Sequence, residues 1–247
     1  MEHITYQEIR AEGDLVPYVD SFWMIANTGE SPLDIVVLPD GRMDVSFNMG
    51  TNPASVLHGL ETKAQKAAFP PATRMFAISF RFLAAEFFFK PYAPVLPNNI
   101  RFLPADFWGA DVQFDSLEAF ARLFTDTLSA RLPGAVDSRK LRLAELLYAS
   151  EGAATVGELS AACHWSSRQI NRYFQQNLGL PLKAYLDILR FRASFKHLKA
   201  GKLFPEQDFT DQSHFIRDVR KFAGVVPGEL SRNSNDRFIQ FSTLSAS

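Results

Sequence analysis

The period of the hydrophobic pattern changes part-way along the chain, and this change limits the folds that the chain can adopt. Up to about residue 105, short strand-like runs are bounded by turn residues: 21–25 and 34–38 are mostly apolar, whereas 44–49 and 74–82 alternate between polar and apolar residues. Residues 39–41 are interpreted as only a tight turn. Beyond about residue 105, apolar residues recur three and four positions apart, as over 117–128. Alternation is typical of half-buried strands, and a spacing of three and four positions is typical of amphipathic helices. The sequence therefore predicts an α+β fold: a small N-terminal β-barrel or sandwich followed by helices.

Three parts follow from this pattern. We expect a β-rich domain over 1–110, a helical connector over 111–152 and a separate helical domain over 153–247. The connector carries apolar faces over 117–128 and 141–147, which can pack within the chain or against a second copy. Packing within the chain is the favoured interpretation, and a homodimer is the alternative.

The charges are unevenly distributed. The whole chain has a net charge of −1, but residues 155–247 hold 13 Lys and Arg against 8 Asp and Glu, a net charge of +5. The preceding residues carry −6. A basic final third behind an acidic first part indicates a polyanionic partner for the final third, with chance unevenness as the alternative.

Several classes of protein receive no support from the sequence. A single cysteine, Cys163, excludes an internal disulfide and fits a reducing compartment. We find neither a signal peptide nor an apolar run long enough to span a membrane, so a cytoplasmic protein with no membrane partner is expected. Only His3 and His58 precede Thr155, so no metal site or cofactor is expected. The chain has neither a Gly-rich phosphate loop nor a nucleophile elbow, so no enzymatic activity is expected.

Residues 155–174 have the outline of a helix-turn-helix. Thr155 and Glu158 match a capping box that begins a first helix. A break follows at 163–165, and Ser166 offers an N-cap for a second helix. In this arrangement the second helix enters the major groove of DNA.

The second helix carries polar residues suited to reading bases. Ile170 and Phe174 are four positions apart and face the core, so Arg168, Asn171 and Arg172 fall on the other side, with Gln169 near its edge. Arg, Asn and Gln can pair their hydrogen bonds with guanine or adenine. A merely solvated helix face is the simpler alternative.

Residues 209–217 and 220–227 resemble the C-terminal signature of the AraC-type transcription regulators. Further residues stand where that family places its first helix-turn-helix, namely Leu159-Ser160, Trp165-Ser166, residues 172–174, Gly179 and Tyr185. Residues 190–193 resemble the helix that joins the two motifs, and the likeness covers about residues 150–232. The resemblance implies a bacterial transcription regulator whose all-α C-terminal domain binds double-stranded DNA through two helix-turn-helix motifs.

The resemblance also implies roles for individual residues. In the first recognition helix, the residues implied to reach base edges or flanking phosphates are Arg168, Gln169, Asn171 and Arg172. Those in the second would be Gln212, Ser213, His214 and Arg217, with Arg220 and Lys221 as phosphate contacts.

Two positions depart from the family pattern. His164 stands where the family usually has a turn glycine, although His tolerates positive φ. The segment before Phe209 contains Pro205, which would interrupt a helix, so the second motif is expected to be shortened. The alternative function is a small-molecule-binding or protein-interaction module whose DNA reader is degenerate.

The N-terminal part is similar to the domain found on some AraC-type regulators. Residues 17–23, 38–44 and 78–82 carry this likeness. It implies a cupin-like small barrel that binds a small-molecule effector or a partner. These motifs consist of turns and core strands, so they name no ligand.

Overall fold

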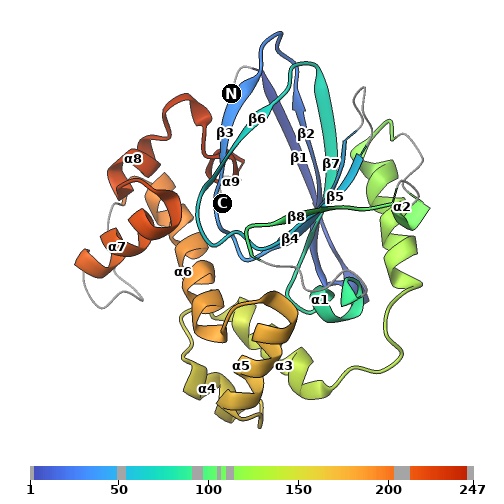
Figure 1. The fold of residues 1–247 in the computed structure, drawn as a ribbon, viewed down its shortest axis with the longest axis vertical. Helices are drawn as coiled ribbons and strands as arrows, with labels where there is room; N and C mark the ends of the chain where they lie inside the picture. The colour runs from blue at the N-terminus through green and yellow to red at the C-terminus, as the bar shows by residue number, and fades with distance from the viewer. Residues whose placement is uncertain are drawn as a thin grey trace.

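The N-terminal part of the protein is built from two antiparallel sheets. The computed structural model describes residues 3–48, 54–90, 97–104, 107–109, 114–202 and 212–243. A six-stranded sheet has the order β1-β2-β7-β4-β5-β8, and β3 pairs with β6 in a second sheet. The strands are β1 (Ile4–Arg10), β2 (Val19–Asn27), β3 (Leu33–Val37), β4 (Met43–Asn48), β5 (Ala54–His58), β6 (Gln65–Phe69), β7 (Thr73–Phe80) and β8 (Ile100–Phe102). Figure 1 shows this β part above the first C-terminal helices.

The two faces of the large sheet differ in chemistry because successive side chains point to opposite sides. On one face, Phe22 of β2 and Phe76 of β7 are fully buried. On the other, Trp23 and Met75 line a cavity between the two sheets. One face therefore forms core, and the opposite face is available to a ligand.

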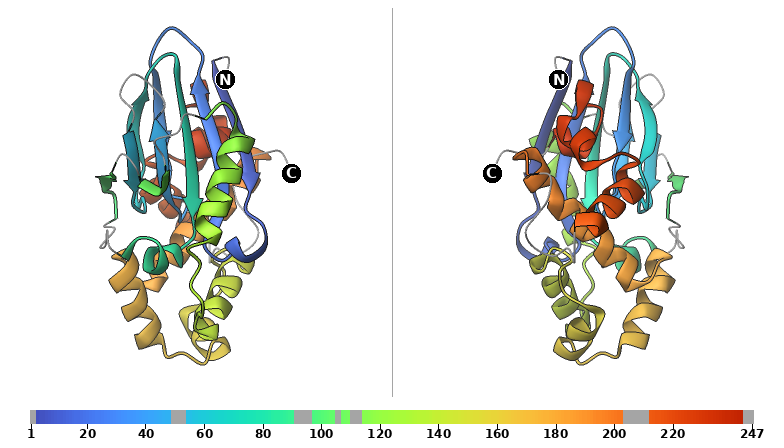
Figure 2. Two further views of the ribbon diagram at one scale, coloured as in Figure 1. Left: turned by 90° about the vertical axis from the view of Figure 1, so that its right-hand side faces the viewer. Right: turned by 90° about the vertical axis from the view of Figure 1, so that its left-hand side faces the viewer.

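Helix α2 (Leu117–Ser129) covers the phenylalanine face, as Figure 2 shows. Phe120 stacks on Phe76 with ring centroids 5.2 Å apart, and Phe124 stacks on Phe47 at 4.8 Å. Burying each such ring is worth about 1.5–3 kcal/mol. The predicted apolar face of this helix is confirmed, and it packs within the chain.

The remaining helices surround one long central helix, α6 (Leu182–Lys199). In Figure 1, α6 runs from a lower group of helices to α7 and α8. The lower group comprises α3 (Ser138–Ala149), α4 (Val156–Ala162) and α5 (Ser167–Leu178); α7 spans Gln212–Ala223 and α8 spans Pro227–Arg232. A short helix, α1 (Ala84–Phe87), contacts α5 from the β part.

The end of the chain returns to the small sheet. Val36 of β3 donates its amide hydrogen to the carbonyl of Arg237 at 2.6 Å, and Leu38 donates to Oε1 of Gln240 at 2.7 Å. Gln240 belongs to the last helix, α9 (Ile239–Ser242). The helical part is thus bonded to the β part at the end of the chain, which the sequence did not indicate.

The predicted order, a β domain followed by helices, is confirmed. The strands expected over 21–25, 34–38, 44–49 and 74–82 correspond to β2, β3, β4 and β7, while β1, β5, β6 and β8 were not predicted. The segment expected to shorten the second motif, including Pro205 and Phe209, lies outside the described residues. The proposed domain boundaries remain predictions.

Candidate nucleic-acid interface and ligand cavity

Helices α4 and α5 lie where the sequence predicts the two helices of a helix-turn-helix, and local hydrogen bonds fix where each begins. That they act as a DNA-binding motif stays a prediction. Oγ1 of Thr155 accepts from the amide of Glu158 at 3.2 Å, and the Glu158 carboxylate accepts from the amide of Thr155 at 2.7 Å. This confirms the predicted capping box. In the turn, His164 has φ of 49°, a left-handed conformation that His tolerates.

Helix α5 begins with a second capping box, which involves a predicted DNA-contacting residue. Oγ of Ser166 accepts from the amide of Gln169 at 3.3 Å, and Oε1 of Gln169 accepts from the amide of Ser166 at 3.2 Å. The predicted N-cap is confirmed. The carboxamide of Gln169 is therefore engaged in the cap, and its contact with DNA stays a prediction.

The faces of α5 follow the predicted division. Ile170 and Phe174 are fully buried, and Phe174 stacks on Phe82 of the β part at 5.1 Å. Arg168 and Arg172 are exposed. The helix is therefore held by its apolar face while two guanidinium groups reach solvent.

Asn171 is half-buried and already bonded at both ends of its amide. Its Nδ2 donates to the carbonyl of Ser167 at 2.9 Å, and its Oδ1 accepts from the amide of Leu182 at 3.1 Å. Leu182 is the first residue of α6, so Asn171 fixes where α6 begins relative to α5. The predicted base contact of Asn171 would have to compete with these bonds.

Helix α7 presents the second predicted set. Its inner side buries Phe215, Val219 and Phe222. Nδ1 of His214 lies 3.9 Å from the carboxylate of Asp218, and this imidazole is half-buried. The other predicted residues of this helix are exposed: Gln212, Ser213, Arg217, Arg220 and Lys221.

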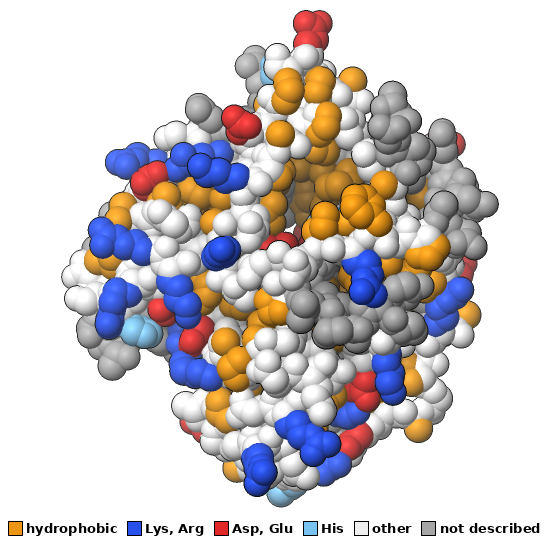
Figure 3. Space-filling view, viewed as in Figure 1, with side chains coloured by type: hydrophobic (Ala, Val, Ile, Leu, Met, Phe, Trp, Pro, Cys, Tyr) orange, Lys and Arg blue, Asp and Glu red, His pale blue; other side chains and the backbone are white. Residues whose placement is uncertain are grey.

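Basic side chains gather along one side of the molecule. In Figure 3, Lys and Arg lie along the left and lower margins, where Figure 1 draws α5, α6 and α7. This matches the positive charge of residues 155–247. The structure thus brings both predicted helices to the surface, and whether they contact DNA stays a prediction.

A cavity of about 710 Å³ lies between the two sheets. Its apolar wall includes Ile25, Ile35, Val37 and Phe69 from three different strands. Helix α6 closes one side with Arg192, Phe195 and Lys196, and α9 contributes Ile239 and Gln240. Figure 3 shows the hollow with apolar walls and acidic atoms in its depth. Its volume is that of pockets that take small organic ligands.

Residues 7–99 match the family model described as a domain of unknown function, DUF6597. The match covers most of the β part, from within β1 to just before β8, and none of the C-terminal helices. A search of the curated proteins found no match.

Among solved structures, the chain is similar to ToxT from Vibrio cholerae. For ToxT of strain O395 the identity is 11% and the TM-score 0.42, covering 99% of this chain and 100% of that chain. For a second crystal form the values are 10% and 0.41, covering 93% and 98%. For unsaturated fatty acid bound wild-type ToxT of strain SCE256 they are 10% and 0.40, covering 92% and 94%. At these values the likeness assigns neither fold nor function to the chain.

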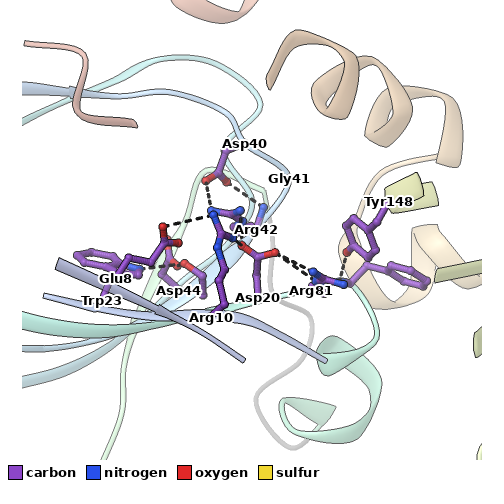
Figure 4. Close-up of polar contacts among 12 residues, drawn as sticks. Glu8, Arg10, Asp20, Trp23, Asp40, Gly41, Arg42, Asp44, Arg81 and Tyr148 are labelled. Atoms are coloured by element: carbon purple, nitrogen blue, oxygen red, sulfur yellow. Dashed lines mark hydrogen bonds and ion pairs between the residues drawn. The ribbon is translucent and has the colours of Figure 1, made fainter. Parts of the chain in front are cut away.

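One carboxylate pairs with three arginines, as Figure 4 shows, and two of them, Arg10 and Arg42, line the cavity. Asp20 is buried and forms ion pairs with Arg10 at 2.6 Å, with Arg81 at 3.0 Å and with Arg42. Burial alone would raise the pKa of Asp20, but the guanidinium groups of Arg42, Arg10 and Arg81 outweigh it and hold that pKa below its usual value. Asp20 is therefore a structural anion that positions the arginines.

Two acids of the cavity wall, Asp44 and Glu61, form no ion pair with a described residue, although Arg42 is near enough to Asp44 to offset part of the rise in its pKa. Asp44 accepts a hydrogen bond from Oγ of Ser79 at 2.5 Å, and burial together with nearby Asp40 raises its pKa to about 7. Burial, then Asp40 and Asp44, raise the pKa of Glu61 well above its usual value. His58 stays neutral at pH 7, because burial lowers its pKa to about 4.

Within the described ranges, no group of three or more His, Cys, Asp and Glu side chains is placed to hold a metal ion. Over the same ranges, no helix is both long and apolar enough to cross a membrane.

A turn beside the cavity is bonded to the middle of α6. The hydroxyl of Tyr185 donates to the carbonyl of Gly41 at 2.8 Å and lies 2.9 Å from the hydroxyl of Tyr148. The Tyr148 hydroxyl in turn accepts from the amide of Phe82 at 3.1 Å. Asp40 and Arg42, on either side of Gly41, line the cavity. The cavity wall and the helix between α5 and α7 are therefore directly connected.

The sequence reasoning missed the polar wall of the cavity. One signal was present: Asp44, Ser46 and Ser79 occur at alternate positions of otherwise apolar strands, where side chains share a face. Polar residues on the inward face of a strand indicate a site, because burying them is costly unless they are bonded. The interpretation of 39–41 as only a tight turn also omitted its bond to α6.

Proposed function

We propose that this protein is a sequence-specific DNA-binding transcription regulator whose β part binds a small-molecule effector. The observation that carries the proposal is helix α5, which is anchored by Ile170 and Phe174 and presents Arg168 and Arg172 to solvent. A recognition helix needs both properties, since it must be rigid and must expose paired donors to base edges.

The likeness of residues 150–232 to AraC-type regulators supports the same proposal. The positive charge of residues 155–247 and the exposed cations of α7 suit a phosphate backbone. In this proposal Arg168 and Arg172 reach base edges, while Arg220 and Lys221 contact phosphates. Gln169 and Asn171 act first as helix-positioning residues, because both are bonded within the protein.

Effector control is supported by the position of α6. This helix separates α5 from α7 and also lines the cavity with Arg192 and Phe195. A ligand that moves α6 would alter the spacing of the two helices proposed to contact DNA. An effector can regulate DNA binding only if it binds one conformation of the protein more tightly than another.

The alternative is a ligand-binding or protein-interaction module whose DNA reader is degenerate. A selection experiment separates the two functions: the full chain is mixed with a pool of random duplexes at low salt, and retained DNA is amplified and sequenced. We expect enrichment of a common sequence, with an affinity that falls by about 0.9 log unit per log unit of salt for each phosphate contact.

Two variants extend this test. Lys221→Ala should weaken binding to all duplexes to a similar extent, because a phosphate contact carries no base information. Arg122→Ala, an exposed position on α2, serves as the matched control and should bind like the wild type. Retention of no duplex at any salt concentration would support the alternative function.

A further inference from the structure

Acidic and basic side chains both line the cavity, but two of the acids have no ion pair with a described residue. Five carboxylates lie in or beside its floor: Glu8, Asp20, Asp40, Asp44 and Glu61. The guanidinium groups among them belong to Arg10, Arg42 and Arg81, and their ion pairs are with Asp20, Glu8 and Asp40. Asp44 and Glu61 form no ion pair with any residue that the structure describes.

Of the two acids, Glu61 has fewer polar partners than Asp44, which accepts a hydrogen bond from Ser79. Glu61 follows β5, is half-buried in the cavity wall, and makes no side-chain hydrogen bond to another described residue, although its carboxylate accepts from its own backbone amide. A buried carboxylate without a partner is costly in its charged form. Glu61 therefore either stays protonated or is neutralised by a cation that enters the cavity.

The surroundings favour an organic cation over a metal ion. Within the described ranges, the acidic side chains are not grouped closely enough to hold a metal. The wall between them is apolar or aromatic, with the rings of Tyr6 and Trp23 packed at 6.3 Å and Ile25 and Met75 nearby. Aromatic faces attract ammonium and guanidinium groups, and the apolar wall suits a hydrocarbon or aryl body.

We propose that the cavity binds a small organic cation, an ammonium or amidinium group on an apolar body, whose charge is neutralised by Asp44 and Glu61. The effector site of the proposed regulator would thus be a cation site, and in that respect this inference rests on the proposed function. Five basic side chains also line the cavity. Arg10 and Arg42 pair with other acids, Lys66 is exposed on β6, Lys196 pairs with Glu151 at 3.6 Å, and Arg192 reaches the cavity from α6.

Binding of such a cation is coupled to proton release. The pKa of Asp44 is raised to about 7, and that of Glu61 is raised well above its usual value. Without a bound cation these carboxyl groups therefore hold protons, and an entering ammonium group displaces them. The affinity should therefore rise between about pH 6 and about pH 8. The other titratable or charged groups that face the cavity are Tyr6, Glu8 and Arg10 on β1, Asp40 and Arg42 beside Gly41, His58 on β5, Lys66 on β6, and Arg192 and Lys196 on α6. Of these, His58 does not titrate in that window, because its pKa is about 4.

Three probes of matched shape test the proposal by titration calorimetry on the full chain: 4-phenylbutylamine, 4-phenylbutanol and 4-phenylbutyrate. We expect the amine to bind, at least about tenfold more tightly than the alcohol, and the carboxylate to bind weakest. Asp44→Asn and Glu61→Gln should each weaken amine binding about tenfold or more, whereas Asp34→Asn, an exposed acid on β3, should not.

The probe series requires no variant to fold, so a misfolded Asp44→Asn protein leaves the test intact. The proposal would be overturned if the amine bound with a dissociation constant above about 1 mM, or if the carboxylate bound as tightly as the amine or more tightly. It would also be overturned if the folded double variant, Asp44→Asn with Glu61→Gln, bound the amine like the wild type. Duplex binding without probe is measured on the same samples. Retained DNA binding with no amine binding refutes only the cation site, and the reverse refutes only the regulator.

Discussion

Removing one hydroxyl, by Tyr185→Phe, should loosen the connection between the cavity wall and α6. The ring is completely buried, and its hydroxyl bonds both the Gly41 carbonyl and the Tyr148 hydroxyl. Phenylalanine keeps the packing but leaves the Gly41 carbonyl without this donor. The free energy of unfolding should fall by about 1–3 kcal/mol, the cost of a buried polar group that loses its partner.

Urea unfolding of the full chain, followed by circular dichroism, measures this change. With a slope of about 2–3 kcal/mol per molar urea, the midpoint should fall by about 0.3–1.5 M while the slope stays constant. Tyr6→Phe is the matched control, because the Tyr6 hydroxyl makes no hydrogen bond with a described residue, and its effect should stay within about 0.5 kcal/mol. If Tyr185→Phe and Tyr6→Phe unfold at the same midpoint, the Tyr185 bonds do not stabilise the contact and the reasoning is wrong.

Three further changes are expected in the same unfolding assay. Gly152→Ala should cost about 2 kcal/mol or more, because a Cβ there would lie 2.4 Å from the Leu186 carbonyl oxygen, whereas Gly134→Ala meets nothing within 4 Å and should be near neutral. Ser166→Ala should cost about 1 kcal/mol through loss of the α5 cap, and an unchanged midpoint would contradict that role. Asp44→Asn should flatten the pH profile of stability. The folded-state pKa of Asp44, about 7, exceeds the unfolded value of about 3.9, so this residue's stabilisation is present below about pH 4 and is lost as the pH rises to about 7; a profile identical to wild type would refute the raised pKa.

Local sequence signals determined much of the helical part. Thr155 and Ser166 were recognisable as N-caps because their side chains bond amides only a few residues away. Strands with β-branched or alternating residues were also recognisable. β1, β5, β6 and β8 were not, because many of their residues are partly or fully exposed and their place depends on partners distant in the chain.

The cavity depends on contacts that no local pattern encodes. Glu61, Asp44 and Arg192 come from separate elements and meet only once the sheets and α6 have packed. The bond from Tyr185 to Gly41 likewise joins residues 144 positions apart. Sequence alone predicted the exposed face of α5, because helix periodicity fixes it, but not that Gln169 and Asn171 would be bonded internally.

The most direct test of the regulator is the affinity of Arg172→Ala for the selected duplex and for a scrambled duplex of the same composition. A base contact by Arg172 predicts a loss of about 1–3 kcal/mol on the selected duplex, a relaxed preference at one base pair, and little change on the scrambled one. Wild-type affinity of Arg172→Ala for the selected duplex, with its base preference intact, would contradict the assignment of α5 as the helix that reads DNA.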